Sequence, residues 1–361
     1  MPNIVTVNVS QQVASVPSKL QQTGALISMG GTTTSGGAVT FLSSLADLVP
    51  IIGTGGGAAE LQGMANTFFA QGNTIGVYVL ELGTTDVTTG VAALTSYIAN
   101  PTLRFYSYLV PVEWATNADF QALTQAHSSP TSQLYFFVGD LISGSPAPYV
   151  AFEGTKSVFF VAIDPATPLS VFPPAAFFHA TLSYAPGASN LVSPLSWTYL
   201  YGVSAYALTN AQQVTLQTVG VNWVGTGAEG GISNTLIVGG TLMDVNPWNY
   251  WYAVDWLSIN VEQSLAAAVI NGSNNPQNPL YYNQAGINRL QAVAQATADN
   301  GVSFGMILSP VSVTATPFTT YVAENPGDYA IGRYAGLACT FVPARGFNTI
   351  VINLTASNIP V

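Results

Sequence analysis

The sequence predicts a mixed α/β protein: an α/β layer domain, a second α/β domain towards the C-terminus, and an extended strand near each end of the chain. Between residues 60 and 140 the spacing of apolar residues switches repeatedly between the helical and the strand period. Helices and strands in alternation are typical of a layer with a largely parallel sheet. From about residue 241 two long helical patterns follow. A chain of 361 residues is long enough for about two domains.

The first half of the chain contains the helices and strands expected to form the α/β layer. The expected order is a strand at 4–10, a helix on the stripe Leu61, Met64 and Phe68 that stops at Gly72, a strand at 75–82, a helix at 90–101, a strand at 104–112, a helix that starts at Asn117 or Asp119, and strands at 134–140 and 156–164. Residues 15–24 read as a linker, and residues 165–240 are rich in Pro, Gly and Ser with short aromatic runs.

The C-terminal part contains two helical stripes and a final strand. The first stripe, within 248–272, is Leu257, Val261, Leu265 and Val269. The second, within 283–300, is Ile287, Leu290, Ala294 and Ala298, with Gly301 as the expected stop. In the final strand Ile350, Ile352 and Leu354 alternate with Thr349, Val351 and Asn353, as Val5, Val7 and Val9 alternate with polar residues in the first strand.

The charge of the chain is unusually low. Only 6% of the residues are Asp, Glu, Lys or Arg, against about 25% in an ordinary soluble domain. No charged side chain stands between Asp164 and Glu229. Since charges are the usual protection against self-association, we expect copies of the same chain to cover much of the surface. The alternative on composition alone is a secreted, neutral β-protein.

Composition also excludes several classes of function. No apolar run is long enough for a membrane-spanning helix, and the N-terminus lacks the pattern of a signal peptide. Six scattered bases against 16 acids, a net charge of −10, make direct binding to nucleic acid improbable. The single cysteine, Cys339, excludes an intrachain disulfide and is expected to be a buried apolar residue.

The stretch IIGTGGGAAE raises the question of a nucleotide site. Gly53, Gly55 and Ala58 give G-x-G-x-x-A, and Glu81 stands near the distance at which an acid would bind a ribose. The strand that should precede such a loop is missing, because Pro50 interrupts it and LSSLADLV (42–49) reads as a helical turn. We therefore predict a structural loop. A Rossmann-like nucleotide-binding enzyme is the alternative from another class.

Catalytic groups are scarce, and we expect neither an enzyme nor a bound cofactor or metal ion. His127 is predicted to end a helix, and His179 stands among aromatic residues as a structural histidine. Gly154-Thr155-Lys156-Ser157 resembles only the end of a P-loop, since the upstream glycine is absent. Glu324 and Asp328 flank the turn at Pro326-Gly327 and are expected to be solvated.

The order of the segments resembles that of contractile tail sheath proteins of phages, in a minimal and divergent form. Four segments show the resemblance. The first contains Ala65, Phe68, Phe69, Gln71 and Gly72 followed by Tyr78–Leu82, and the second is 171–203. The third is the run LTNAQQVTLQTVGVNWVG with Leu208, Ala211, Leu216, Gly220, Val221 and Asn222, and the fourth is the helix of 251–270 with Glu262 and Ser264. Two positions depart from the family pattern: Val254-Asp255 replaces paired arginines, and Pro-Leu-Ser at 194–196 replaces Pro-Pro-Ser. Charge contacts of those arginines are therefore not transferred.

The resemblance implies a structural and mechanical subunit of the virion, assembled in the host cytoplasm. Such subunits polymerise in helical rings around a tail tube and contract to drive it through the host envelope. The implied partners are copies of the chain, the tail tube protein, and baseplate and tail terminator proteins. A tail-tube or capsid subunit is the alternative in the same setting, but it would lack the α/β layer with long helices.

The resemblance also divides the chain. It implies an N-terminal arm at 1–20, an outer α/β domain at 21–240, an inner, tube-facing domain at 241–345 and a C-terminal arm at 346–361. The arms would pair with strands of neighbouring subunits. The residues expected to contact neighbours are Val5, Val7, Val9, Ile350, Val351, Ile352 and Leu354. The tube-facing residues expected on the second helix are Gln284, Asn288, Gln291 and Gln295.

Overall fold

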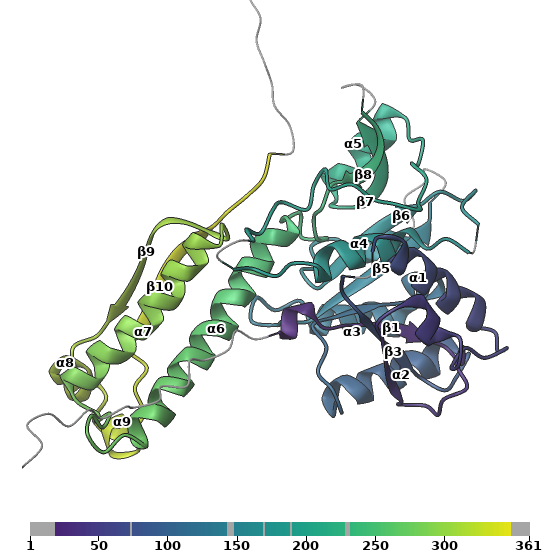
Figure 1. The fold of residues 1–361 in the computed structure, drawn as a ribbon. Helices are drawn as coiled ribbons and strands as arrows, with labels where there is room; N and C mark the ends of the chain where they lie inside the picture. Colours follow the sequence, from purple (N-terminus) through teal and green to yellow (C-terminus); the bar gives the residue numbers. More distant parts are fainter. Residues whose placement is uncertain are drawn as a thin grey trace, which may run out of the picture. The chain divides into compact units, whose positions relative to one another are not determined.

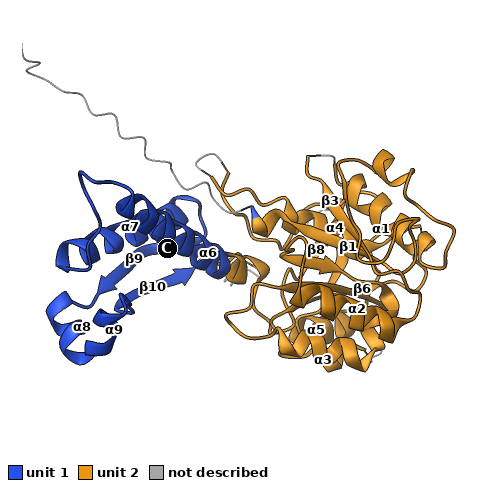
Figure 2. Ribbon diagram, turned by 90° about the horizontal axis from the view of Figure 1, so that it is seen from below, with its two compact units in different colours: residues 1–19, 253–343 blue, residues 20–252, 344–361 orange. Residues whose placement is uncertain are grey.

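The structure, a computed structural model, describes residues 19–72, 74–142, 148–168, 170–187, 190–227 and 232–347. These residues form two units, each with its own packing (Figure 2). Unit 2 holds the described residues from Leu20 to Tyr252 together with 344–347, and unit 1 holds 253–343. Both predicted arm strands, 4–10 and 349–354, lie outside the described residues. The residues Val5, Val7, Val9, Ile350, Val351, Ile352 and Leu354 therefore stay predictions.

An eight-stranded sheet forms the centre of unit 2 (Figure 1), in the order β2-β3-β1-β4-β5-β6-β7-β8. The six inner strands are parallel to one another, whereas β2 and β8 pair antiparallel at the two ends. The strands are β1 (Gly24–Ser28), β2 (Val39–Leu42), β3 (Val77–Glu81), β4 (Ser107–Leu109), β5 (Tyr135–Leu141), β6 (Val158–Ile163), β7 (Asn222–Gly227) and β8 (Ile232–Val238).

Helices cover both faces of this sheet, as parallel strands require. Figure 2 shows α1 and α4 on one side and α2, α3 and α5 on the other. The helices are α1 (Ala58–Ala70), α2 (Val87–Ala99), α3 (Ala118–Ala126), α4 (Pro173–Leu182) and α5 (Asn210–Thr218). Polar side chains begin several of them: Asp86 accepts a hydrogen bond from Thr89 N at 2.8 Å, and Asn117 from Phe120 N at 3.0 Å.

Aromatic rings fill the space between sheet and helices. On one face the fully buried Trp248, at the start of α6 (Trp248–Ser273), packs against the rings of Tyr135 at 4.9 Å and Phe137 at 5.4 Å. On the other face Phe120 of α3 meets Phe136 at 5.5 Å. Burying a large side chain contributes roughly 1.5–3 kcal/mol, so these rings supply a large share of the stability of unit 2.

The predicted alternation is confirmed, and the mixed α/β class with it. The helices and strands expected between residues 58 and 164 are present as α1, β3, α2, β4, α3, β5 and β6, and the helical turn at 42–49 is the 3-10 helix η2 (Leu45–Leu48). Several elements of this unit were not predicted from the sequence. They are β1, whose five residues are all buried, and β2, α4, α5, β7 and β8.

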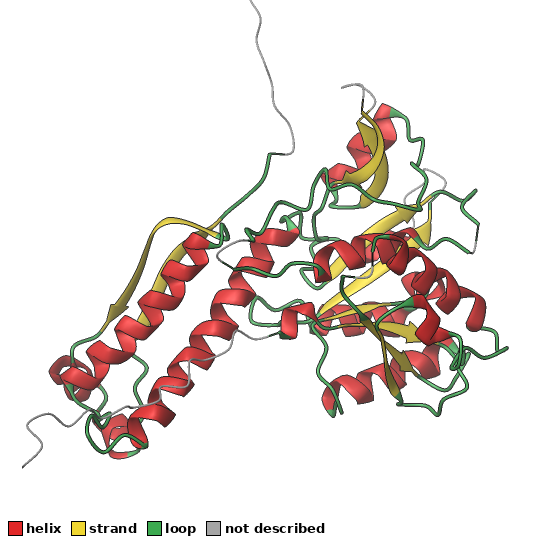
Figure 3. Cartoon of the chain, in the orientation of Figure 1, coloured by secondary structure: helices red, strands yellow, loops and turns green. Residues whose placement is uncertain are grey.

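Unit 1 consists of helices and a two-stranded sheet (Figure 3). Beyond its share of α6, it contains α7 (Gln284–Ser303), β9 (Ile307–Ala315), α8 (Phe318–Glu324), α9 (Pro326–Ala330) and β10 (Leu337–Pro343). β9 and β10 pair antiparallel, with Cys339 opposite Val313. Neither strand was predicted from the sequence.

The predicted end of α7 at Gly301 is wrong. The helix continues to Ser303, and Gly301 lies buried inside it, where an added Cβ would stand 2.7 Å from Ile307 Cδ1. The glycine that ends the helix is Gly305, with a φ of +73°. Gly301 is therefore a residue of close packing. None of the helices in the described part of the chain has the length and apolar content needed to cross a bilayer.

Candidate functional site

The glycine loop before α1 packs against the chain's own backbone. A Cβ on Gly55 would collide with the carbonyl oxygen of Gly30, and one on Gly57 with that of Met29. The N–H of Gly53 donates to Gly31 O at 2.8 Å. The space that a dinucleotide-binding loop leaves for a pyrophosphate is therefore filled by residues 29–31.

Glu81, the acid that would bind a ribose, is only 1% exposed and is already fully engaged. Its carboxylate accepts hydrogen bonds from Ser28 Oγ at 2.6 Å and from Thr32 Oγ1 at 2.8 Å. The backbone N–H groups of Gly30, Thr32 and Gly83 donate to it at 2.8, 3.0 and 2.6 Å. Burial opposes the charge, but these donors outweigh it and hold the pKa of Glu81 below its usual value.

These contacts decide the question that the glycine loop raises. Glu81 ties the loop after β1 to the end of β3, and the glycines let the segment before α1 lie against that loop. The 3-10 helix η2 stands where a nucleotide fold has its first strand. The loop is structural, as predicted, and the alternative of a nucleotide site is wrong.

Lys156, in the remnant of a P-loop pattern, is buried. Its Nζ donates to the carbonyl oxygens of Ser132 at 2.6 Å and Pro130 at 3.2 Å, and lies 4.3 Å from the centre of the Trp251 ring. Carbonyl dipoles and a ring face stabilise a buried ammonium. The lysine thus fixes the start of β6 and does not face a phosphate.

Both histidines lie in structural surroundings. His127 ends α3, as predicted, and burial lowers its pKa. His179 lies inside α4 with its ring 4.9 Å from that of Phe68, and its Nε2 has no hydrogen-bond partner. Burial lowers the pKa of His179 to about 4, against the effect of a hydrogen bond with the backbone of Gly72. Across the described ranges, no three His, Cys, Asp or Glu side chains gather as a metal ion would need.

Asp328, expected to be solvated, is hydrogen-bonded. It accepts a bond from Tyr321 Oη at 2.6 Å and lies 3.9 Å from Arg333. The Tyr321 oxygen in turn accepts a bond from the N–H of Ala335 at 2.9 Å. The Asp328 carboxylate is partly exposed and holds the segment after α9 in place, whereas Glu324 is exposed as expected.

In unit 1, side chains of α7 bind the outer backbone edge of β9 in the two-stranded sheet. Gln295 of α7 accepts a hydrogen bond from Val313 N at 2.8 Å, and Gln291 donates to Val313 O at 2.9 Å. Gln295 also donates to Val311 O at 3.3 Å. Two glutamine side chains therefore occupy the backbone groups on the outer edge of β9, where another strand would otherwise pair.

The opposite edge of the sheet, on β10, is open. In an antiparallel pair, residues directly opposite each other either exchange their hydrogen bonds or both point outward. Val313 points outward to the glutamines, so its partner Cys339 points its N–H and C=O away from β9. Cys339 is exposed, and the prediction that it is buried is wrong, because side chains on both faces of β10 around it are exposed.

The four residues predicted to face a tube lie on α7. Gln284 accepts a hydrogen bond from Phe318 N at 2.7 Å and donates to Asn288 at 2.7 Å. Gln291 and Gln295 bind β9 as described. These side chains were selected from the sequence for their polarity. Their bonds to β9 were not predicted, since that strand had not been predicted. Their contact with a tube stays a prediction.

Comparison with known proteins bears on the whole chain. No family model matches the sequence, and no curated protein matches it. Among solved structures, the helical sheath of the anti-feeding prophage (AFP) in its contracted state has a TM-score of 0.61 at 14% identity, over 99% of this chain and 99% of that one. A sheath tail protein from Desulfitobacterium hafniense has a TM-score of 0.53 at 8% identity, over 94% and 100%.

The chain has the fold of a tail sheath protein. A sheath tail protein from Listeria innocua gives the same result, with a TM-score of 0.53 at 8% identity over 82% of this chain and 89% of that one. The resemblance predicted from the sequence is thus confirmed at the level of the fold. The sheath fold extends over both units, so the eight-stranded layer and the β9–β10 hairpin belong to one architecture.

The glycine loop generates a paired prediction. Gly55→Ala adds a methyl group against Gly30 O, whereas at Gly56 the nearest atom to an added Cβ is Thr85 Cγ2 at 3.8 Å. We expect Gly55→Ala to lower the unfolding free energy by about 2 kcal/mol or more, since overpacking against backbone costs about 1–3 kcal/mol. Gly56→Ala should stay within about 0.5 kcal/mol of wild type. Denaturant unfolding followed by circular dichroism measures both.

The same variants test the nucleotide alternative. Titration calorimetry of the wild type with NAD, FAD or ATP should show no saturable binding below millimolar concentration. Equal stability of the Gly55→Ala and Gly56→Ala variants would contradict the packing of the loop.

His179 predicts an acid-sensitive fold. The unfolded chain takes up a proton near the ordinary pKa of 6.5, but the folded protein does so only near 4. The contribution of His179 to stability is therefore complete above pH 6.5 and is lost as the pH falls from 6.5 towards 4. His179→Asn keeps a donor near Gly72 but does not titrate, so its melting temperature should fall less steeply across this window. Parallel pH curves for the two proteins would contradict the assignment.

Proposed function

We propose that this chain is the structural subunit of a contractile tail sheath. Copies polymerise in helical rings around a tail tube, and contraction of the polymer drives the tube through the envelope of a host cell. The observation that carries the proposal is the likeness to the AFP helical sheath over 99% of both chains. A function in assembly also suits a chain in which the groups typical of catalytic and nucleotide sites are engaged in packing.

Composition supports the polymer on independent grounds. With 6% charged residues, the surface of a lone subunit has little protection against association. The polymer removes much of that surface from water. Large apolar side chains remain exposed in both units, among them Phe41, Val269 and Ile331. Exposed apolar groups of this size are typical of surfaces that contact another protein.

The arms give the polymer its connections in this proposal. The alternating strands of the N-terminal arm (1–20) and the C-terminal arm (346–361) pair with another copy. The receiving position is the outer edge of β10, whose N–H and C=O at Cys339 point away from β9. The glutamines on β9 exclude the other edge. Added strands of this kind gain affinity from main-chain hydrogen bonds and register from alternating side chains.

The remaining partners follow from the same proposal. They are the tail tube protein, met by unit 1, and baseplate and tail terminator proteins at the two ends of the polymer. One of the similar structures is that of the AFP baseplate in its contracted state. The assembled particle would be a phage tail, built in the host cytoplasm.

Cys339→Pro tests the open edge. Proline removes the outward N–H that an added strand needs, but no hydrogen bond of the β9–β10 ladder. We expect the subunit to keep its melting temperature within a few degrees of wild type, and long tubes to disappear from negative-stain micrographs. Cys339→Ala, which keeps the N–H, is the control and should form tubes. Val351→Pro in the C-terminal arm should have the same effect as Cys339→Pro.

Thr340→Pro provides the opposite comparison. Thr340 is the neighbour of Cys339 along β10, so its N–H points towards β9 and its loss should lower the stability of unit 1. Tubes formed by Cys339→Pro at wild-type yield would refute pairing at this edge. Wild-type protein that stays monomeric at high concentration would refute the proposed polymer itself.

A further inference from the structure

An irregular strand closes the last edge of the large sheet. β8 pairs with β7 on one side, and residues 197–201 bind its other side. Trp197 N donates to Ile237 O at 2.9 Å, Ile237 N to Thr198 O at 2.9 Å, and Leu200 N to Thr235 O at 2.9 Å. This segment is therefore held by main-chain bonds.

The side chains of the segment alternate between the core and solvent. Leu200 is buried, whereas Trp197, Tyr199 and Tyr201 are 46%, 47% and 59% exposed. Leu191 (66% exposed) and Phe347 (80% exposed) lie on neighbouring stretches, and Trp197 Nε1 donates to Phe347 O at 3.1 Å. We call these five residues the aromatic platform. Tryptophan and tyrosine are the residues most enriched at the centres of protein interfaces.

The backbone at Trp197 is strained. Its φ is +70°, a value that bulky residues rarely adopt and that glycine adopts freely. Backbone outliers of this kind cost about 1–3 kcal/mol and are concentrated at functional sites. Glycine would relieve this strain, so the tryptophan holds a backbone conformation that glycine would adopt without cost.

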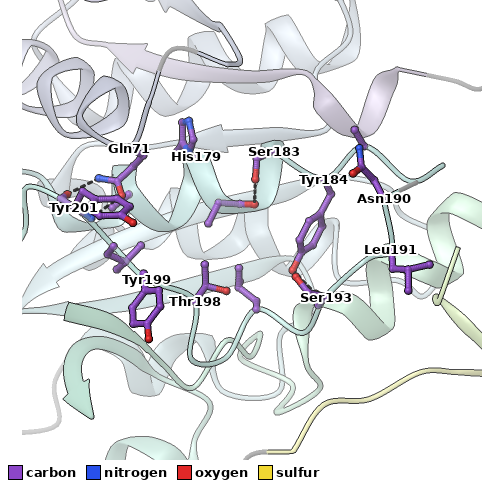
Figure 4. Close-up of a pocket in the computed structure, with 15 residues that line it drawn as sticks. Gln71, His179, Ser183, Tyr184, Asn190, Leu191, Ser193, Thr198, Tyr199 and Tyr201 are labelled. Carbon is purple, nitrogen blue, oxygen red and sulfur yellow. Dashed lines mark hydrogen bonds between the residues drawn. The ribbon is translucent and has the colours of Figure 1, made fainter. Parts of the chain in front are cut away.

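A hollow of about 400 Å³ opens beside the platform (Figure 4). Tyr199, Tyr201 and Leu191 line one part of it, and Ser183 and Tyr184 at the end of α4 line another. Gln71 holds the backbone of Tyr201 in place. Its side-chain amide accepts a hydrogen bond from Tyr201 N at 2.9 Å and donates one to Tyr201 O at 2.5 Å. The platform thus has a rigid backbone and a recess large enough for one or two side chains.

We propose that the aromatic platform is a contact between subunits, occupied in the polymer by a second copy of this chain. The inference rests on the proposed function and adds to it a surface of unit 2 that is separate from the arms and from β10. A side chain of the second copy enters the hollow, and the rings of Trp197, Tyr199 and Tyr201 pack around it.

Two observations favour a second copy as the occupant. Residues 165–228, which contain four of the five platform residues, carry no Asp, Glu, Lys or Arg, so this stretch offers no charge with which to select a polyanion or a basic protein. The C-terminal arm also leaves the described chain at Phe347, on the platform itself. The 14 residues that follow span at most about 50 Å, so the copy that receives them lies within that distance of Phe347.

Trp197→Gly separates assembly from folding. Glycine suits the positive φ, so we expect the melting temperature of the subunit to stay the same or rise. The loss of the central ring should raise the critical concentration for tube formation at least tenfold, measured by sedimentation and light scattering. Val49→Ser, which removes an apolar side chain that is more exposed than Trp197 and lies outside the platform, is the control and should leave the critical concentration unchanged.

A photo-crosslinking amino acid in place of Tyr199 identifies the occupant. Irradiated tubes should contain chains crosslinked to a second copy. Crosslinks confined within one chain would overturn the proposal, as would equal effects of Trp197→Gly and Val49→Ser. If Trp197→Gly lowers the melting temperature, the tryptophan supports the fold, and Tyr199→Ser then decides by whether it raises the critical concentration.

The test separates this inference from the proposed function. Trp197→Gly subunits that form tubes at the wild-type concentration would overturn the platform and leave the sheath proposal standing. Wild-type subunits that never form tubes would overturn both.

Discussion

A backbone N–H or C=O at the edge of a sheet needs a partner, and this constraint organises much of the molecule. In unit 2 the edge strand β2 is only four residues long, and the irregular strand 197–201 closes the edge of β8. In unit 1 the amides of Gln291 and Gln295 occupy the edge of β9. Among the edges of the described strands, β10 alone is both long and unoccupied, and it is the position at which we place the neighbouring subunit.

The two ways of closing a sheet edge, by side-chain amides and by a main-chain segment, leave different groups exposed to solvent. A side-chain amide binds one or two backbone groups and leaves no new edge. A segment such as 197–201 satisfies β8 with its own main chain but has to place every second side chain outward. The structure uses glutamines where an edge only has to be blocked. It uses an aromatic segment where, in our proposal, the outward side chains contact another copy.

Three of the charged residues of this chain hold loops in place. Glu81 binds five donors around the ends of β1 and β3, Lys156 binds two carbonyl groups before β6, and Asp328 fixes the segment after α9. Each of these groups needs several partners, because an unpaired charge in the interior would be strongly destabilising. The remaining surface is left to neutral polar and apolar side chains, which suits a subunit whose copies cover one another.

The sequence by itself determined the local elements whose periodicity is strong. The helices and strands from 58 to 164 follow from apolar spacing, the end of α3 at His127 follows from the helical pattern, and the absence of a strand before Gly53 follows from Pro50. The order of segments even indicated the sheath fold. These features depend on neighbours within a few positions, so a single sequence carries them.

Only the tertiary structure decided the features that depend on distant partners. β1 was not predicted, because its five buried residues show no alternation, and it is identified by pairing with β3 and β4. Gly301 has the residue type of a helix stop, yet packing against Ile307 places it inside α7. The engagement of Glu81, the outward direction of Cys339 and the exposure of Trp197 are set by contacts across the fold. Hydrogen-bond geometry and burial arise from positions in space, which spacing along the chain does not contain.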